Sequence, residues 1–135
     1  MYRIIVAPID LAVPTICEHI LHKALFHLRN SDCQVHLTTI ASANADEAKL
    51  DELRGKLMVF AEEHISAHEG RIHLNVAKGL PADQILAFAD GKNAELILVG
   101  SHRGGASQLG RATLGSTAAK VASQAKCDVC IVKAD

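Results

Sequence analysis

The chain has 135 residues, 49% of them hydrophobic, which is enough apolar material for one folded core without disulfides or metals. Its 14 basic residues nearly balance 15 acidic ones, and there is no tryptophan, so nucleic acid and anionic membranes are not expected partners. No apolar run approaches the ~18–20 residues of a membrane span and residues 1–10 lack a signal-peptide pattern, so we expect a single cytoplasmic domain over residues 1–135.

Hydrophobic periodicity divides the chain into alternating strands and helices. In chain order, the sequence predicts a strand at 3–8, a helix at 15–29, a strand at 34–40, a helix at 44–68, a strand at 71–77, a helix at 81–90, a strand at 95–99, a helix at 115–124 and a strand at 128–133. This alternation is typical of an α/β fold, here a single-domain, doubly wound, five-stranded parallel sheet with four helices covering both faces.

In a doubly wound sheet, the default ligand site is the crevice at the carboxyl ends of the two strands where the strand order reverses. If the first and fourth predicted strands flank that point, the residues that follow them face one another. The site would then be lined by Pro8, Ile9, Asp10, Gly100, Ser101 and His102.

Five glycines occur within the sixteen residues 100–115, between the fourth strand and the last helix. Glycine lets backbone N–H groups approach an anion closely, and a helix N-terminus adds positive potential. Gly115, Ser116 and Thr117 supply such a helix start with two hydroxyls, and Arg103 and Arg111 could add charge-assisted bonds to phosphate. Glycines before a helix can also form a plain loop, but their number and the Gly-Ser-Thr start favour an anion or nucleotide site.

Asp10, at the end of the first predicted strand, supplies a carboxylate near this glycine-rich segment. It could hold a ribose hydroxyl or a Mg²⁺ ion bound through the phosphates. Two better-known nucleotide motifs are excluded. Residues 10–14 contain no glycine for a G-x-G-x-x-G turn, and Arg111 and Ala112 stand where the Walker A motif requires Lys and then Ser or Thr.

Segment 105–116 resembles the signature of the universal stress protein family, in which nine residues separate one glycine from a final glycine that is followed by Ser or Thr. Gly105, Gly115 and Ser116 reproduce this part. Residues 4–10, 96–102 and 125–132 resemble the family's first, fourth and last strands, so the resemblance covers nearly the whole chain. It implies the strand order 3-2-1-4-5, a regulatory or stress-response role, binding of ATP or AMP, and a homodimer through the C-terminal strand.

Carried over position by position, the resemblance implies an adenine nucleotide site. Pro8, Ile9, Asp10 and Ile40 would contact base and ribose, Val99 and Gly100 would line the ribose side, and Gly105, Gly115, Ser116 and Thr117 would hold the phosphates. Ser101, His102 and Arg103 complete the candidate nucleotide-binding set, and Asp10 is the candidate ligand of phosphate-bound Mg²⁺.

Departures from the family pattern keep other functions open. Arg103 stands where many ATP-binding members have glycine, the 102–115 loop is longer than usual, and residues 11–14 replace a stretch that is often small and polar. The first alternative is therefore an interaction module that keeps the fold without binding nucleotide. The second is an enzyme, for which the absence of a visible nucleophile–base pair predicts at most slow ATP hydrolysis or autophosphorylation. The scarcity of aromatic residues disfavours a flavin carrier.

Histidines and cysteines suggest two further kinds of site. His64 and His68 have a spacing that can bind a divalent ion with a carboxylate, but H-E-x-x-H is absent, and we interpret both as surface residues. Cys127 and Cys130 have the spacing of a C-x-x-C motif. They flank a predicted strand, however, whereas the cysteines of a redox C-x-x-C motif usually open a helix. We therefore expect no metal and no redox role for them.

Overall fold

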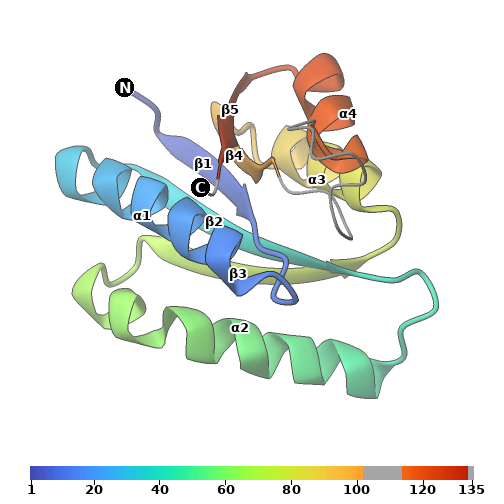
Figure 1. The fold of residues 1–135 in the computed structure, drawn as a ribbon. Coiled ribbons are helices and arrows are strands. Elements are labelled where there is room, and N and C mark those ends of the chain that lie inside the picture. Colours follow the sequence, from blue (N-terminus) through green and yellow to red (C-terminus); the bar gives the residue numbers. More distant parts are fainter. Residues whose placement is uncertain (102–113, 134–135) are drawn as a thin grey trace.

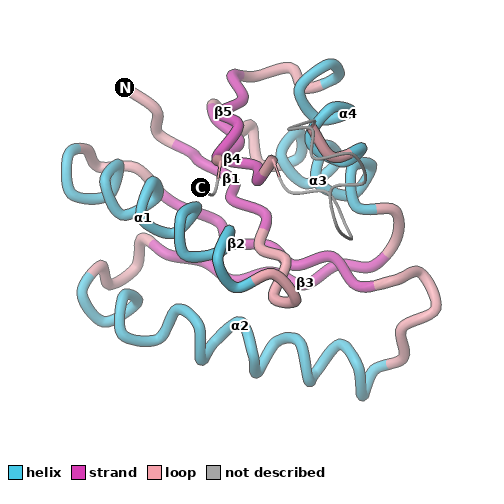
Figure 2. Tube along the Cα trace, viewed as in Figure 1, coloured by secondary structure: helices cyan, strands magenta, loops and turns pink. Residues whose placement is uncertain are grey.

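The computed structural model describes residues 1–101 and 114–133, in which strands and helices alternate as predicted (Figure 2). The elements are β1 (Ile4–Pro8), α1 (Pro14–Asn30), β2 (Gln34–Ala41), α2 (Glu47–Ala67), β3 (Ile72–Lys78), α3 (Pro81–Gly91), β4 (Leu96–Gly100), α4 (Ser116–Gln124) and β5 (Asp128–Val132). Each lies within three residues of its predicted bounds. No helix in these described residues is long and apolar enough to cross a membrane.

The five strands pair in parallel in the order β3-β2-β1-β4-β5, which confirms the predicted fold class and the order implied by the resemblance. Figure 1 shows α1 and α2 on one face of the sheet and α3 and α4 on the other. β1 lies in the middle, and its three central residues are fully buried, as expected for a strand covered on both faces. The sheet is therefore doubly wound about β1.

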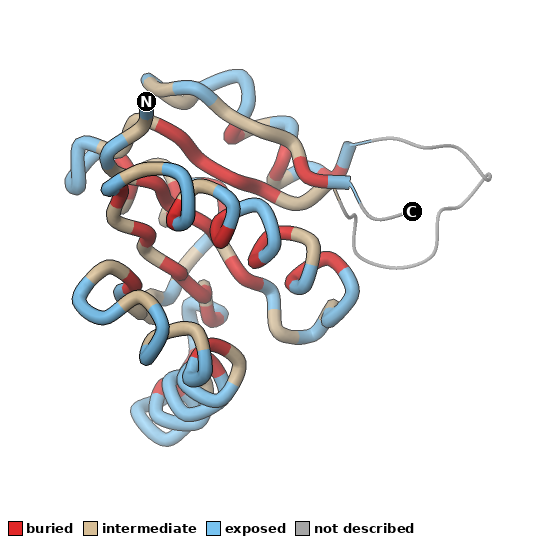
Figure 3. Tube along the Cα trace, turned by 90° about the vertical axis from the view of Figure 1, so that its left-hand side faces the viewer, coloured by how far each residue is buried: buried red, intermediate tan, exposed pale blue. Residues whose placement is uncertain are grey.

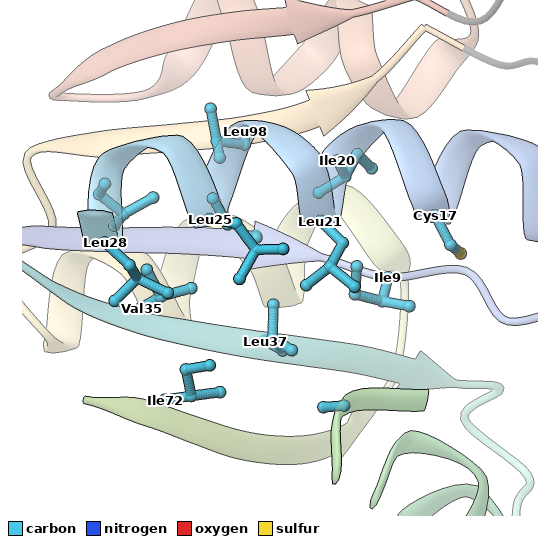
Figure 4. Close-up of a cluster of buried hydrophobic side chains, with 14 of the residues drawn as sticks. Ile9, Cys17, Ile20, Leu21, Leu25, Leu28, Val35, Leu37, Ile72 and Leu98 are labelled. Atoms are coloured by element: carbon cyan, nitrogen blue, oxygen red, sulfur yellow. The ribbon is translucent and has the colours of Figure 1, made fainter. Parts of the chain in front are cut away.

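The sheet separates two hydrophobic cores. The larger core packs α1 and α2 against the sheet, and Figure 4 shows Leu21, Leu25 and Leu28 of α1 above Val35 and Leu37 of β2. The smaller core packs α3 and α4 against the other face, with Ile85 and Val121 meeting β1 and β4. Buried backbone runs through the centre of the molecule between exposed outer helix faces (Figure 3).

Local sequence signals set the ends of α2. The Asp46 side chain caps the helix by accepting a hydrogen bond of 2.9 Å from the backbone N–H of Lys49. The helix ends at Ala67, and Gly70 follows with a φ of +77°, a conformation that favours glycine. Gly70 therefore lets the chain turn away after the helix in a conformation that would strain another residue.

Replacing Gly55 by alanine should stabilise the protein by about 0.5–1 kcal/mol. Gly55 lies inside α2, and a Cβ added there meets no heavy atom within 4 Å, so alanine gains helix propensity without a clash. Gly70→Ala is the matched control, because its Cβ also meets open space but its positive φ strains any other residue. Urea denaturation should show a gain for Gly55→Ala and a loss for Gly70→Ala; a loss for both would contradict the argument.

Arg71, just before β3, ties three segments together. Its guanidinium donates hydrogen bonds to the carbonyl of Leu28 in α1 at 2.9 Å, to that of Cys33 before β2 at 3.1 Å, and to that of Ser31 between them. These carbonyls include acceptors that the end of α1 leaves without helical partners. The side chain therefore closes the turn between α1 and β2 from the neighbouring strand.

Candidate functional site

The strand order reverses at the carboxyl ends of β1 and β4. The chain runs from β1 outward to β2 and β3 and then returns to the other side of β1 as β4. A cavity of about 520 Å³ lies at this edge of the sheet, and its walls include residues from the ends of β1, β2 and β4 and from all four helices. This is the place where doubly wound proteins bind their ligands.

Most of the candidate residues that the structure describes lie in this one cavity. Its lining includes Pro8, Ile9, Asp10, Ile40, Val99, Gly100 and Thr117. Ser101, Gly115 and Ser116 lie within two positions of the lining residues Gly100 and Thr117 and are not part of the wall itself. His102, Arg103 and Gly105 lie outside the described residues. The structure thus brings together side chains that are up to about a hundred positions apart in the sequence.

The end of β1 is fixed to β2 by two hydrogen bonds. The Ile9 N–H donates to the Thr38 carbonyl at 2.7 Å, and the buried Thr39 hydroxyl donates to the Ile9 carbonyl at 2.9 Å. Both backbone groups of Ile9 are therefore satisfied by β2, beyond the last residue of the regular strand. This arrangement delivers Asp10 to the cavity in a defined position.

Asp10 forms a turn that leads into α1. Its carboxylate accepts a hydrogen bond from the Ala12 N–H at 3.1 Å, and its carbonyl accepts from the Val13 N–H and from the Cys17 thiol, each at 2.9 Å. Burial raises the pKa of Cys17 to about 11, so the thiol stays protonated and acts as a donor rather than a nucleophile. The Asp10 carboxylate remains exposed, as required to meet a hydroxyl or a cation.

Gly100 is needed for packing as much as for the loop. A Cβ at this position would lie 2.7 Å from Cγ1 of Ile16, a distance that real structures do not show. The absence of a side chain lets α1 approach the end of β4 closely. The sequence predicted Gly100 as a flexible, phosphate-approaching glycine, and the close approach to α1 gives a further physical reason for it.

The N-terminus of α4 faces the same edge of the sheet. Gly115 occupies the N-cap position in an extended conformation, and its N–H donates to the Ser101 carbonyl at 3.3 Å. Ser101 in turn donates from its own N–H to Val132 of β5 at 2.9 Å. Thr117, in the first turn of α4, lines the cavity. A helix start in this position presents unpaired N–H groups and the positive end of the helix dipole to an anion.

Among the wall residues that sequence reasoning missed, five lie near the end of β2 and on α2. Thr38 and Thr39 are buried at the end of β2, and Lys49, Leu53 and Lys56 come from the first turns of α2. The spacing of the last three, at positions i, i+4 and i+7, places them on one face of a helix. That face carries both polar and apolar side chains, so its sequence pattern does not mark it as a binding surface. Only the three-dimensional position of α2 identifies it as part of the cavity.

No group of three or more His, Cys, Asp or Glu side chains in the described part of the chain is arranged to hold a metal ion. His64 lies 3.4 Å from the Glu63 carboxylate on the half-buried side of α2. Cys127 and Cys130 are half-buried, and burial raises the pKa of the Cys127 thiol. Outside the cavity, the described histidine whose pKa is shifted most is His36 on β2.

His36 should make stability fall in acid. Its ring stacks on His73 at 4.7 Å, and burial, then His73 and Lys92, lower its pKa from 6.5 to about 4. The unfolded chain therefore binds a proton more readily, so stability is complete above about pH 6.5 and declines as the pH falls toward 4. At about 1.4 kcal/mol per unit, reduced by solvent screening, we expect a loss of about 1–2 kcal/mol.

His36→Phe tests this expectation, because phenylalanine keeps an aromatic ring beside His73 and removes the titration. Urea unfolding between pH 7 and pH 4 should show a smaller loss of stability for the variant than for the wild type. Equal losses for the two proteins would contradict the assignment.

The doubly wound parallel sheet and the cavity at its switch point define an α/β protein with a cavity at the carboxyl edge of the sheet, where proteins of this architecture commonly bind ligands. The family model of the universal stress protein family matches residues 1–133, and the chain belongs to this family.

Individual relatives agree with the family assignment. Universal stress protein MJ0531 of Methanocaldococcus jannaschii is 41% identical to this chain over 63 residues. The matched segment covers 47% of this chain and 36% of that protein, so it spans about a third of the relative's length. A universal stress protein of Archaeoglobus fulgidus superposes with a TM-score of 0.76 at 20% identity, covering 98% and 95% of the two chains. A universal stress protein in complex with cAMP gives 0.68 at 24% identity, covering 97% and 96%.

Proposed function

We propose that this protein binds an adenine nucleotide in the cavity at the carboxyl ends of β1 and β4 and acts as a regulatory or stress-response protein in the cytoplasm. The observation that carries the proposal is the meeting, in one cavity of about 520 Å³, of the Asp10 carboxylate, apolar side chains and the first turn of α4. These three features match the ribose, the base and the phosphates of a nucleotide.

Each part of the proposed ligand has residues suited to it. Ile9, Ile40 and Val99 offer apolar surface for the base and the carbon side of the ribose, and Pro8 lies beside them. The exposed Asp10 carboxylate can accept a ribose hydroxyl or hold Mg²⁺ on the phosphates. Gly115, Ser116 and Thr117, at the start of α4, would bind the phosphates, with His102, Arg103 and Gly105 contributing from the preceding segment.

Known relatives support the choice of adenine. The Archaeoglobus fulgidus universal stress protein has been solved in complex with dAMP; it superposes with a TM-score of 0.75 at 20% identity, covering 98% of both chains. The relative in complex with cAMP carries the same base. No catalytic duty is proposed, since no pair of nucleophile and base is evident among the described residues that line the cavity.

Mg²⁺-ATP or AMP at millimolar concentration should raise the melting temperature of the purified protein by several degrees. A ligand at about 100 times its Kd adds about 2.7 kcal/mol to the stability of the folded state. Asp10→Asn should remove most of this shift, because it keeps a side chain able to accept from Ala12 but loses the charge that meets the ribose or Mg²⁺. Differential scanning calorimetry measures both effects.

Asp51→Asn is the matched control, since Asp51 is an exposed carboxylate of α2 that pairs with Arg54 away from the cavity. It should leave the nucleotide shift unchanged. Absence of a shift in the wild type with either nucleotide, together with no nucleotide released on denaturing the purified protein, would refute nucleotide binding and favour an interaction module.

We further propose a homodimer formed through β5. Among the residues that the structure describes, this strand pairs with β4 on one side only and so ends the sheet. Its residues Val129, Cys130 and Ile131 are half-buried, which gives a second copy apolar surface beside the free strand edge. Sedimentation equilibrium should give twice the chain mass; a monomer at micromolar concentration would contradict the proposal.

A further inference from the structure

Besides the ends of β1 and β4, the cavity reaches α2. Lys49, Leu53 and Lys56 form its wall there, all on one face of the helix. Only residues 42–46 separate β2 from α2, so the helix begins at the carboxyl edge of the sheet rather than farther away. Figure 1 shows this end of α2 on the side of the molecule where β2 and β3 end.

The two lysines share one carboxylate. Lys49 Nζ lies 3.2 Å and Lys56 Nζ 3.0 Å from the same Oε2 atom of Glu52, and both lysines hold the pKa of that carboxyl below its usual value. Lys49 and Lys56 line the cavity and Glu52 does not, so the wall formed by α2 presents two ammonium groups to it. All three side chains are about half exposed, so the ammonium groups can turn toward an anion at small cost.

Charges therefore alternate across the cavity. The positive start of α4 lies on the β4 side, the Asp10 carboxylate follows β1 in the middle, and the lysines of α2 lie beyond β2. Neighbouring strands are about 4.8 Å apart, so these groups are spread over a width that suits a nucleotide. Phosphate, ribose hydroxyl and a second phosphate would meet these charges in the same order.

We propose that Lys49 and Lys56 form a second anion subsite and that the cavity takes an adenosine nucleotide carrying one phosphate at the 5′ position and another on the 2′ or 3′ oxygen of the ribose. The proposal rests on the nucleotide binding proposed above and names the class of nucleotide. The α4 end binds the 5′-phosphate, Asp10 binds the remaining ribose hydroxyl, and the two ammonium groups bind the second phosphate by charge-assisted hydrogen bonds.

Isothermal titration calorimetry with AMP, ADP, adenosine 2′,5′-bisphosphate and adenosine 3′,5′-bisphosphate tests this assignment. ADP and the bisphosphates carry the same number of phosphates in different places, so ADP controls for the number of phosphates. At least one bisphosphate should bind about tenfold more tightly than ADP. The double variant Lys49→Gln/Lys56→Gln should remove this advantage, so that the bisphosphates bind no more tightly than ADP, and should weaken AMP binding much less than bisphosphate binding.

Two further variants make the test specific. Arg54→Gln removes a positive charge from the same helix at a position that does not line the cavity, so it should preserve the bisphosphate advantage. Glu52→Gln removes the shared counter-charge and should tighten bisphosphate binding while leaving AMP binding unchanged. Bisphosphates that bind no more tightly than ADP, or an advantage that survives the double lysine variant, would overturn the second subsite. Failure of AMP and ADP to bind would instead refute the proposed function.

Discussion

Replacing Arg71 by methionine should lower the free energy of unfolding by about 2–4 kcal/mol. The guanidinium donates to three partly buried backbone carbonyls, at the end of α1 and in the turn before β2. A hydrogen bond of a charged group contributes about 1.5–3 kcal/mol net, and water can replace part of this at a partly exposed turn. Methionine keeps most of the apolar stem and leaves those partly buried carbonyls without their donor. Urea denaturation at pH 7 measures the loss.

Arg54→Met is the comparison for that experiment. Arg54 pairs with Asp51 and Glu47 on the exposed side of α2, where ion pairs contribute little, so we expect a change below about 0.5 kcal/mol. Arg71→Lys should lie near Arg71→Met, because one ammonium cannot reproduce the guanidinium's planar fork of donors. A loss below 1 kcal/mol for Arg71→Met would show that water replaces the side chain in this turn.

Valine at position 100 should destabilise the protein by about 2–3 kcal/mol and also abolish the nucleotide-induced thermal shift. Its Cβ would lie 2.7 Å from Cγ1 of Ile16 and 3.5 Å from Cδ1 of Ile20, so α1 must move away from β4. Since Gly100, Ile16 and Ile20 all line the cavity, that movement changes the shape of the proposed binding site.

Gly91→Val is the control for Gly100→Val. Gly91 ends α3, and a Cβ added there meets nothing within 4 Å, so stability should change by less than about 0.5 kcal/mol and the thermal shift should persist. A Gly100→Val protein that is destabilised but keeps its full nucleotide shift would separate the two roles of this glycine. In that case the ligand would not depend on the close approach of α1 to β4.

The fold could be predicted from local patterns in the sequence. The buried strands at 4–8 and 96–100 are short unbroken apolar runs, and the helices carry apolar residues at helical spacing. Strand order has few alternatives once the crossovers are right-handed. The switch-point rule then places Asp10 and Gly100 at one edge, and the cavity is found there.

What sequence reasoning could not supply depends on distances between elements. Lys49 and Lys56 look like ordinary surface residues of an exposed helix, and only the position of α2 relative to β2 makes them part of a cavity wall. Arg71 looks like a polar residue before a strand, and its three acceptors lie about forty positions away. The packing reason for Gly100 depends on how closely α1 approaches β4, which no local pattern records.

The walls of the cavity come from both sides of the sheet. Ile16 and Lys49 belong to the layer of α1 and α2, whereas Ile85 and Thr117 belong to the layer of α3 and α4. A molecule bound there would contact both helical layers, which are otherwise separated by the sheet. These contacts would oppose any movement of one layer away from the other. Binding would then reduce local opening on both outer surfaces of the protein. Hydrogen exchange in the first turns of α2 and α4 would therefore slow together. A ligand bound in the cavity would in this way change the stability of surface segments that a larger partner protein could contact without touching the ligand.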